Sequence, residues 1–132
     1  MTDLSEAKLR AAALTLFRAK HPQAVVFRHE DSLRAGIPDT SISWRGITSW
    51  WEFKYANPTI KWRGAQTAEM RRMWSTGIPA HFVIYSEFRG SGPELRIVPA
   101  TDSYKNLQTP HYAVNFNHRI LLDCIERIHR RV

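Results

Sequence analysis

Hydrophobic positions divide the chain into short periodic segments. From Leu4 to about Lys20 the apolar residues recur at helical spacing, which predicts an amphipathic helix with Ser5 as its N-cap. His21-Pro22 ends this helix, because the residue before a proline avoids the α-helical conformation. The chain therefore opens with a helix whose apolar side needs a surface to pack on.

Segments rich in β-branched and aromatic residues follow, and these residue types favour strands. The predicted strands are Ala24–Arg28, Ile37–Trp44, Ile47–Tyr55, His81–Tyr85 and Leu95–Val98.

Two further helices are predicted. One covers Ala65–Ser75 and stops before Gly77-Ile78-Pro79. A C-terminal helix, capped by Asn115 or Asn117, places its apolar residues on one face. The element order is α-β-β-β-α-β with an added strand and helix. It predicts an α/β fold with a mixed central sheet flanked by helices.

Length and charge narrow the class of protein. A chain of 132 residues fits a single domain, and one cysteine, Cys124, excludes a disulfide scaffold. A secretory signal and a membrane-spanning apolar run are not found in the sequence, so we expect a cytoplasmic protein without a membrane partner. The net charge of +7 favours an anionic partner, with nucleic acid foremost.

The second and third predicted strands bring two acids together. If Arg45-Gly46 forms the turn of a hairpin, Trp44 faces Ile47. Counting back from this pair, Asp39 faces Glu52 on the same side of the sheet. Lys54 and Ser41 return to that side by the alternation of a strand, whereas the opposite side collects apolar residues, namely Ile42, Trp44, Trp51, Phe53 and Tyr55.

Two ionised carboxylates at this separation repel each other, and a divalent cation relieves the conflict. Mg²⁺ prefers hard oxygen ligands, to which the Phe53 carbonyl could add one. Such an ion polarises a phosphate and activates water, and the Lys54 ammonium could orient that water or stabilise developing charge. These residue types suit phosphodiester hydrolysis.

The run Gly36-Ile37-Pro38-Asp39, followed by Glu52-Phe53-Lys54 and then Gln66, resembles the PD-(D/E)XK nuclease superfamily. Within it, the chain is most similar to stand-alone VRR-NUC enzymes and Holliday-junction resolvases. The resemblance extends over roughly the first two-thirds of the chain. It implies a restriction-endonuclease-like core and DNA endonuclease activity that depends on Mg²⁺, for which Mn²⁺ can substitute.

The resemblance also implies roles for individual residues. Asp39 and Glu52 match the metal ligands, Lys54 the catalytic lysine and Gln66 a glutamine at the start of the following helix. Glu6 matches a glutamate that in relatives reaches the metal. The same resemblance implies a homodimer, a branched DNA substrate such as a Holliday junction, and no organic cofactor.

Basic and aromatic residues near the motif are candidates for DNA binding. Arg28 and Arg34 could contact phosphates, and Lys61-Trp62-Arg63 combines cations with a ring that can stack on bases. The run His29-Glu30-Asp31 lacks the spacing of metal ligands and is interpreted as a solvated turn.

Other readings stay open at this point. Glu52 and Lys54 could form an ordinary surface pair on a hairpin, and Glu6 could simply favour the helix dipole. A catalytically inactive nucleic-acid-binding module on the same fold is the main alternative function. A basic adaptor for a protein or membrane surface is less favoured, because the cations are scattered over several elements.

Overall fold

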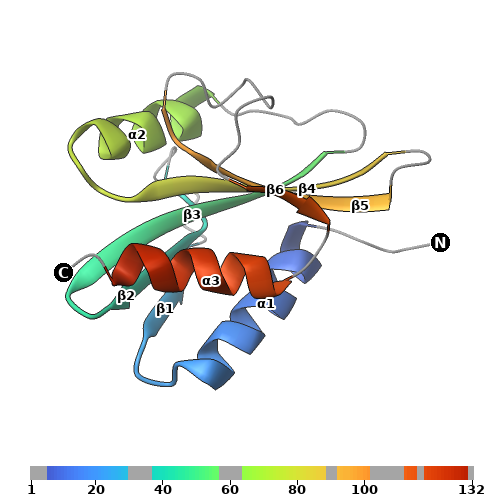
Figure 1. Ribbon diagram of the computed structural model, residues 1–132. Coiled ribbons are helices and arrows are strands. Elements are labelled where there is room, and N and C mark those ends of the chain that lie inside the picture. The colour runs from blue at the N-terminus through green and yellow to red at the C-terminus, as the bar shows by residue number, and fades with distance from the viewer. Residues whose placement is uncertain are drawn as a thin grey trace.

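A mixed β-sheet forms the middle layer of the protein, with helices on both of its faces (Figure 1). The computed structural model describes residues 6–29, 37–56, 64–88, 92–101, 112–115 and 118–130. Within these residues the helices are α1 (Glu6–Lys20), α2 (Gly64–Ser75) and α3 (His118–His129). The strands are β1 (Val25–Arg28), β2 (Thr40–Trp44), β3 (Ile47–Ala56), β4 (Ala80–Phe88), β5 (Gly92–Pro99) and β6 (Tyr112–Asn115).

The described strands lie side by side in chain order, from β1 at one edge to β6 at the other. The pair β3–β4 is parallel, and the other four neighbouring pairs are antiparallel. A parallel pair needs a crossover between its strands, and α2 lies in that connection. The predicted α/β fold with a mixed sheet is therefore confirmed.

Some boundaries differ from the sequence-based expectation. The second strand begins at Thr40 instead of Ile37, because Pro38 has no N–H for a strand hydrogen bond. The short strand β6 was not predicted; it contains Asn115, which excludes that residue as the cap of α3. Four residues carry little pattern of their own, and β6 forms by pairing with β5. Ser5 and Asn117 lie outside the described residues.

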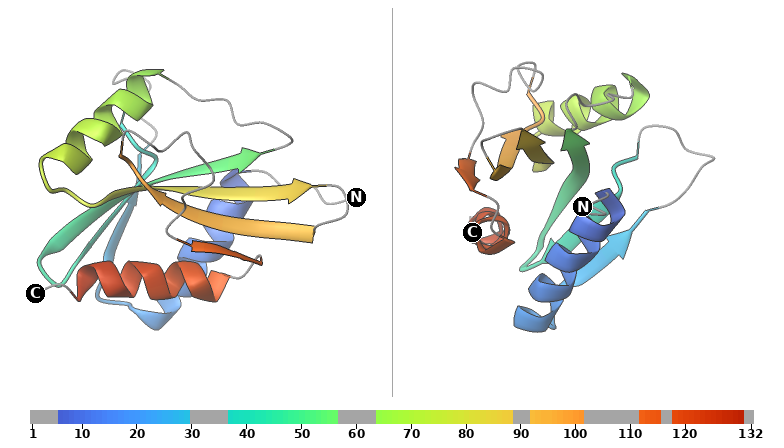
Figure 2. Two further views of the ribbon diagram at one scale, coloured as in Figure 1. Left: turned by 45° about the horizontal axis from the view of Figure 1, so that its top comes forward. Right: turned by 90° about the vertical axis from the view of Figure 1, so that its right-hand side faces the viewer.

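Two hydrophobic cores hold the layers together, one on each face of the sheet. The larger core joins α1 and α3 to apolar side chains of the sheet, including the predicted set from Ile42 to Tyr55. The smaller core lies beneath α2 and includes Met70, Phe82 and Ile84. Figure 2 shows α2 and α3 on opposite sides of the sheet. None of the described helices combines the length and apolar character needed to cross a bilayer.

A buried acid links α3 to α1 beside the larger core. Glu126 accepts hydrogen bonds from Lys20 at 2.8 Å and from His21, and it pairs with Arg130 at 3.4 Å. Burial alone would raise the pKa of Glu126, but the bonds from Lys20 and His21 outweigh this effect and lower the pKa. The two helices are therefore joined by charge as well as by apolar contact.

The β2–β3 hairpin has the predicted register. Trp44 pairs with Ile47, and the pairing continues to Thr40 and Trp51. Arg45 and Gly46 both have positive φ, at 55° and 78°, as a type I′ turn requires. The turn and the alternation of side chains together fix which residues project from each face.

Replacing Gly46 with alanine should lower the free energy of unfolding by about 1 kcal/mol, because a β-carbon strains a backbone at positive φ. Urea unfolding followed by circular dichroism measures the change. Gly64→Ala is the matched control: an added methyl has equal space there, φ is not positive, and alanine favours the helix. An equal loss in both variants would contradict the role assigned to the turn.

Candidate active site

Two carboxylates meet where β2 begins beside β3. Asp39 directly precedes β2, and its backbone N–H donates to Glu52 Oε1 at 2.9 Å. The Glu52 side chain projects from the face opposite the larger core and is only 4% exposed. The hairpin register thus brings together the two acids that the sequence places opposite each other.

Three donors from different parts of the chain surround Asp39. Thr40 Oγ1 donates to Oδ1 at 2.6 Å, and the Phe53 N–H donates to Oδ2 at 3.1 Å. The guanidinium of Arg10, on α1, lies 3.6 Å from Oδ2 and is almost fully buried. Asp39 is therefore held in one orientation by β2, β3 and α1 together.

Lys54 and Gln66 complete a closed polar network with Glu52. Lys54 Nζ donates to Gln66 Oε1 at 3.1 Å and lies 3.3 Å from Glu52 Oε2. Gln66 Nε2 donates to Glu52 Oε1 at 2.8 Å. All three side chains are buried, and the Gln66 amide directs its oxygen to the cation and its nitrogen to the carboxylate. Gln66 therefore positions both of its neighbours.

Burial and mutual repulsion shift both acids toward their protonated forms. Loss of solvent raises the pKa of Glu52 to about 7, and the negative charge of Asp39 adds to this rise. Burial also raises the pKa of Asp39, although its hydrogen bonds and the charges of Arg10 and Lys54 oppose the shift. The raised pKa of Glu52 means that its carboxyl keeps its proton to higher pH than a free glutamic acid, and a bound metal ion would displace that proton.

The oxygen atoms of this cluster fit a divalent cation. A carboxylate has about four acceptor sites, so Asp39 and Glu52 keep capacity beyond the donors described above. The N–H and C=O of one strand residue point to the same side, and the Phe53 N–H points to Asp39. The Phe53 carbonyl therefore faces the acid pair. Mg²⁺ commonly binds one or two carboxylates and completes its shell with water and phosphate.

The described residues contain no group of three or more His, Cys, Asp or Glu side chains suited to a metal. Glu6, the expected further ligand, begins α1 one turn before Arg10, and its side chain lies outside what the structure describes. The proposed oxygen ligands are accordingly Asp39, Glu52 and the Phe53 carbonyl.

Of the predicted DNA-binding residues, the structure describes only Arg28. Arg34, Lys61, Trp62 and Arg63 lie outside the described residues. Arg28 is exposed at the end of β1, and its register partner is Thr40. By strand alternation its side chain leaves the sheet on the face opposite Asp39 and Glu52. The structure does not bring Arg28 together with the acid pair.

Arg10 and His29 are two neighbours of the acid pair that the sequence-based site did not include. The His29 N–H donates to the Asp39 carbonyl at 2.7 Å, and its Nε2 lies 2.8 Å from Ser41 Oγ. For His29 the interpretation as part of a solvated turn was wrong, because this half-buried residue continues the pairing of β1 with β2, whereas Glu30 and Asp31 lie outside the described residues. Helical spacing from Glu6 could have indicated Arg10, and strand alternation from Phe27 could have indicated His29.

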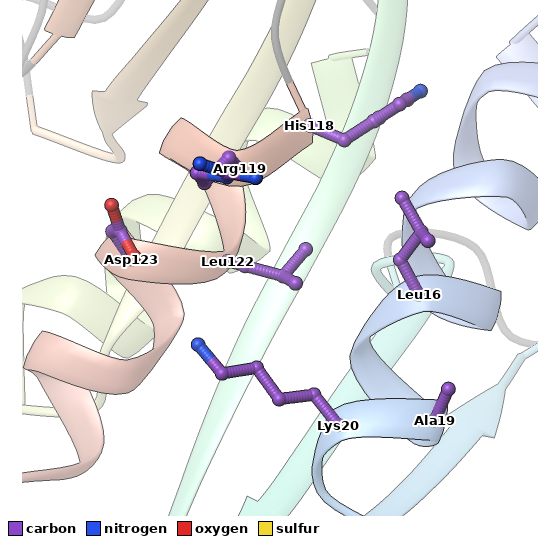
Figure 3. Close-up of a pocket in the computed structure, with 7 residues that line it drawn as sticks. All are labelled: Leu16, Ala19, Lys20, His118, Arg119, Leu122 and Asp123. Carbon is purple, nitrogen blue, oxygen red and sulfur yellow. The ribbon is translucent and has the colours of Figure 1, made fainter.

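A separate surface groove lies between α1 and α3, with a volume of about 960 Å³. Figure 3 shows Leu122 pointing from α3 toward α1, with Lys20 and Arg119 nearby. None of the groove's lining residues belongs to the acid cluster. The candidate chemistry therefore lies apart from this groove.

Comparison with protein-family models gives no matching family, and comparison with curated proteins gives no match either. The features of this chain that bear on function are therefore its sequence motif and the geometry of its polar cluster.

The raised pKa of Glu52 predicts a specific dependence of stability on pH. The folded protein binds this proton more tightly than the unfolded chain, so unfolding becomes easier as pH rises from about 4.5 to about 7. Glu52→Gln removes the titration. In EDTA, the parent protein should lose about 3 kcal/mol of unfolding free energy between pH 4.5 and pH 7 that the Glu52→Gln variant does not lose.

Urea unfolding at several pH values measures that difference. Glu69→Gln is the matched control, since Glu69 lies on the surface of α2 and pairs with exposed Arg72. Its difference from the parent should stay nearly constant. A constant difference for Glu52→Gln as well would show that burial does not disfavour the Glu52 carboxylate.

Proposed function

We propose that this protein is a divalent-metal-dependent DNA endonuclease of the PD-(D/E)XK type, with Mg²⁺ as its ion and Mn²⁺ as a substitute. One observation carries the proposal. The buried Glu52 and the half-buried Asp39 share a sheet face with Lys54, and Gln66 bridges the lysine to Glu52. A hairpin with an ordinary surface ion pair does not bury three polar side chains in one network, as Glu52, Lys54 and Gln66 are buried here.

In this proposal Asp39, Glu52 and the Phe53 carbonyl hold the ion, and Glu6 is a candidate for a further ligand. The bound ion would polarise a phosphate oxygen and lower the pKa of a coordinated water. Lys54 presents its ammonium beside the ligands, where it orients the attacking water or stabilises charge on the phosphate. Gln66 is a positioning residue, because its amide fixes Lys54 relative to Glu52.

DNA is the proposed substrate because the chain carries a net charge of +7 and phosphodiesters are anionic. Selectivity for branched DNA and a homodimeric assembly follow from the resemblance to junction resolvases. Two symmetry-related sites would allow both strands to be cut.

Substituting Asp39→Asn or Lys54→Met should lower the cleavage rate at least about 100-fold, because each removes a group that acts at the reacting phosphate. Labelled linear, nicked, flap and four-way-junction DNA, incubated with Mg²⁺, Mn²⁺ or EDTA, provides the measurement. EDTA should abolish product formation by the parent protein.

Lys20→Met is the control for Lys54→Met, since it also removes a lysine paired with a glutamate but lies at the far end of α1. Thermal melts establish that each variant is folded. Cleavage at the parental rate by folded Asp39→Asn and Lys54→Met would reject the site. Salt-sensitive DNA binding with no metal-dependent product would instead favour the inactive binding module.

A further inference from the structure

An aromatic strip extends along the sheet face that carries the acid pair. It consists of Phe27, His29 and Trp50. The His29 and Trp50 rings are stacked with centroids 5.2 Å apart, and Phe27 lies 6.3 Å from His29 at a tilt of 53°. Phe27 is 57% exposed, more than any other large hydrophobic side chain among the described residues. An exposed ring on the face of a sheet offers a surface on which another planar group can stack.

The pairing of the strands fixes this strip relative to the acid pair. Phe27 pairs with Ser41, and Ser41 pairs with Trp50, so all three project from the same face. His29 bonds to the Asp39 carbonyl through its backbone and to Ser41 through its ring. Phe27 is two strand residues before His29, or about 7 Å along the strand. A group stacked on Phe27 is therefore held beside the carboxylates.

The chemistry of the strip favours a nucleobase as the occupant. Every base has a flat π-face, and stacking on an aromatic side chain contributes about 1–3 kcal/mol per base. The bases of a duplex are already stacked on one another, so only an unpaired base can lie flat on such a ring. The short distance to Asp39 lets the backbone of the same nucleotide reach the acid pair.

We propose that Phe27, supported by His29 and Trp50, stacks an unpaired nucleobase and directs the protein to DNA that is single-stranded beside the cleaved phosphate. The substrate assignment rests on the proposed nuclease function, whereas the base contact can be measured without cleavage. Strand ends, flaps and the open centre of a junction expose such bases, and a continuous duplex does not.

The test measures binding in EDTA to a single-stranded oligonucleotide that contains 2-aminopurine, and to the duplex of the same sequence. Phe27→Ala should weaken single-strand binding about tenfold and change duplex binding less than twofold. Phe27→Trp should restore the binding, because it keeps a ring. The matched control is Val25→Ala, which removes an exposed apolar side chain from the same strand and face and should bind as the parent does.

Several outcomes would contradict the proposal that Phe27 stacks an unpaired base. They are equal effects of Phe27→Ala and Val25→Ala, equal losses on single-stranded and duplex DNA, or a parent protein that does not bind single strands. A change of sedimentation coefficient with Phe27→Ala would show that a second copy of the chain covers the strip instead.

The experiments can reject the base-stacking role of Phe27 without rejecting the nuclease activity, and the reverse. If the parent protein never cuts DNA but the Phe27→Ala variant binds single strands about tenfold more weakly, the nuclease activity is rejected and the base contact is supported. If the parent protein cuts DNA with Mg²⁺ and the Phe27→Ala variant binds and cuts single strands equally well, the base contact is rejected and the nuclease activity is supported.

Discussion

Two carboxylates that face each other at the start of the β2–β3 hairpin, Glu52 buried and Asp39 half-buried, repel each other, and groups from the surrounding elements offset this repulsion. The hairpin register leaves Asp39 and Glu52 no freedom to separate, because a shift by one residue would turn the apolar side of β2 and β3 to the wrong face. The compensating groups come from three elements. Arg10 belongs to α1, Lys54 to β3 and Gln66 to α2, so the conflict lies where these elements meet.

Burying the polar cluster lowers the stability of the protein, and the rest of the fold must compensate for this loss. Burying charge is unfavourable even when partners are present, and replacing such groups by apolar ones is often neutral or stabilising. The two hydrophobic cores, on opposite faces of the sheet, supply the stabilisation. Packing alone would favour apolar residues at the positions of Glu52 and Lys54, so stability does not account for the polar cluster.

Local patterns in the sequence were sufficient for most of the fold and for the centre of the site. The Arg45-Gly46 turn and strand alternation predicted the pairing that brings Asp39 to Glu52, because both depend on residues close in the chain. Arg10 was missed because its contact with Asp39 depends on how α1 docks on the sheet, whereas its spacing from Glu6 indicates only the side of α1 on which it lies. The strand β6 was missed because pairing with β5 stabilises it, instead of a pattern of its own.

The parallel pairing of β3 with β4 has a consequence for how the molecule assembles. The hairpin closes a two-residue turn, whereas β3 can meet β4 only after the chain has passed through α2, at a larger entropic cost of loop closure. Loop-closure entropy favours early formation of the hairpin, which would make the two acids neighbours before α2 brings Gln66 to Glu52 and Lys54. A chain in which only the hairpin has formed would hold the two repelling acids and Lys54 but would still lack Gln66 and Arg10.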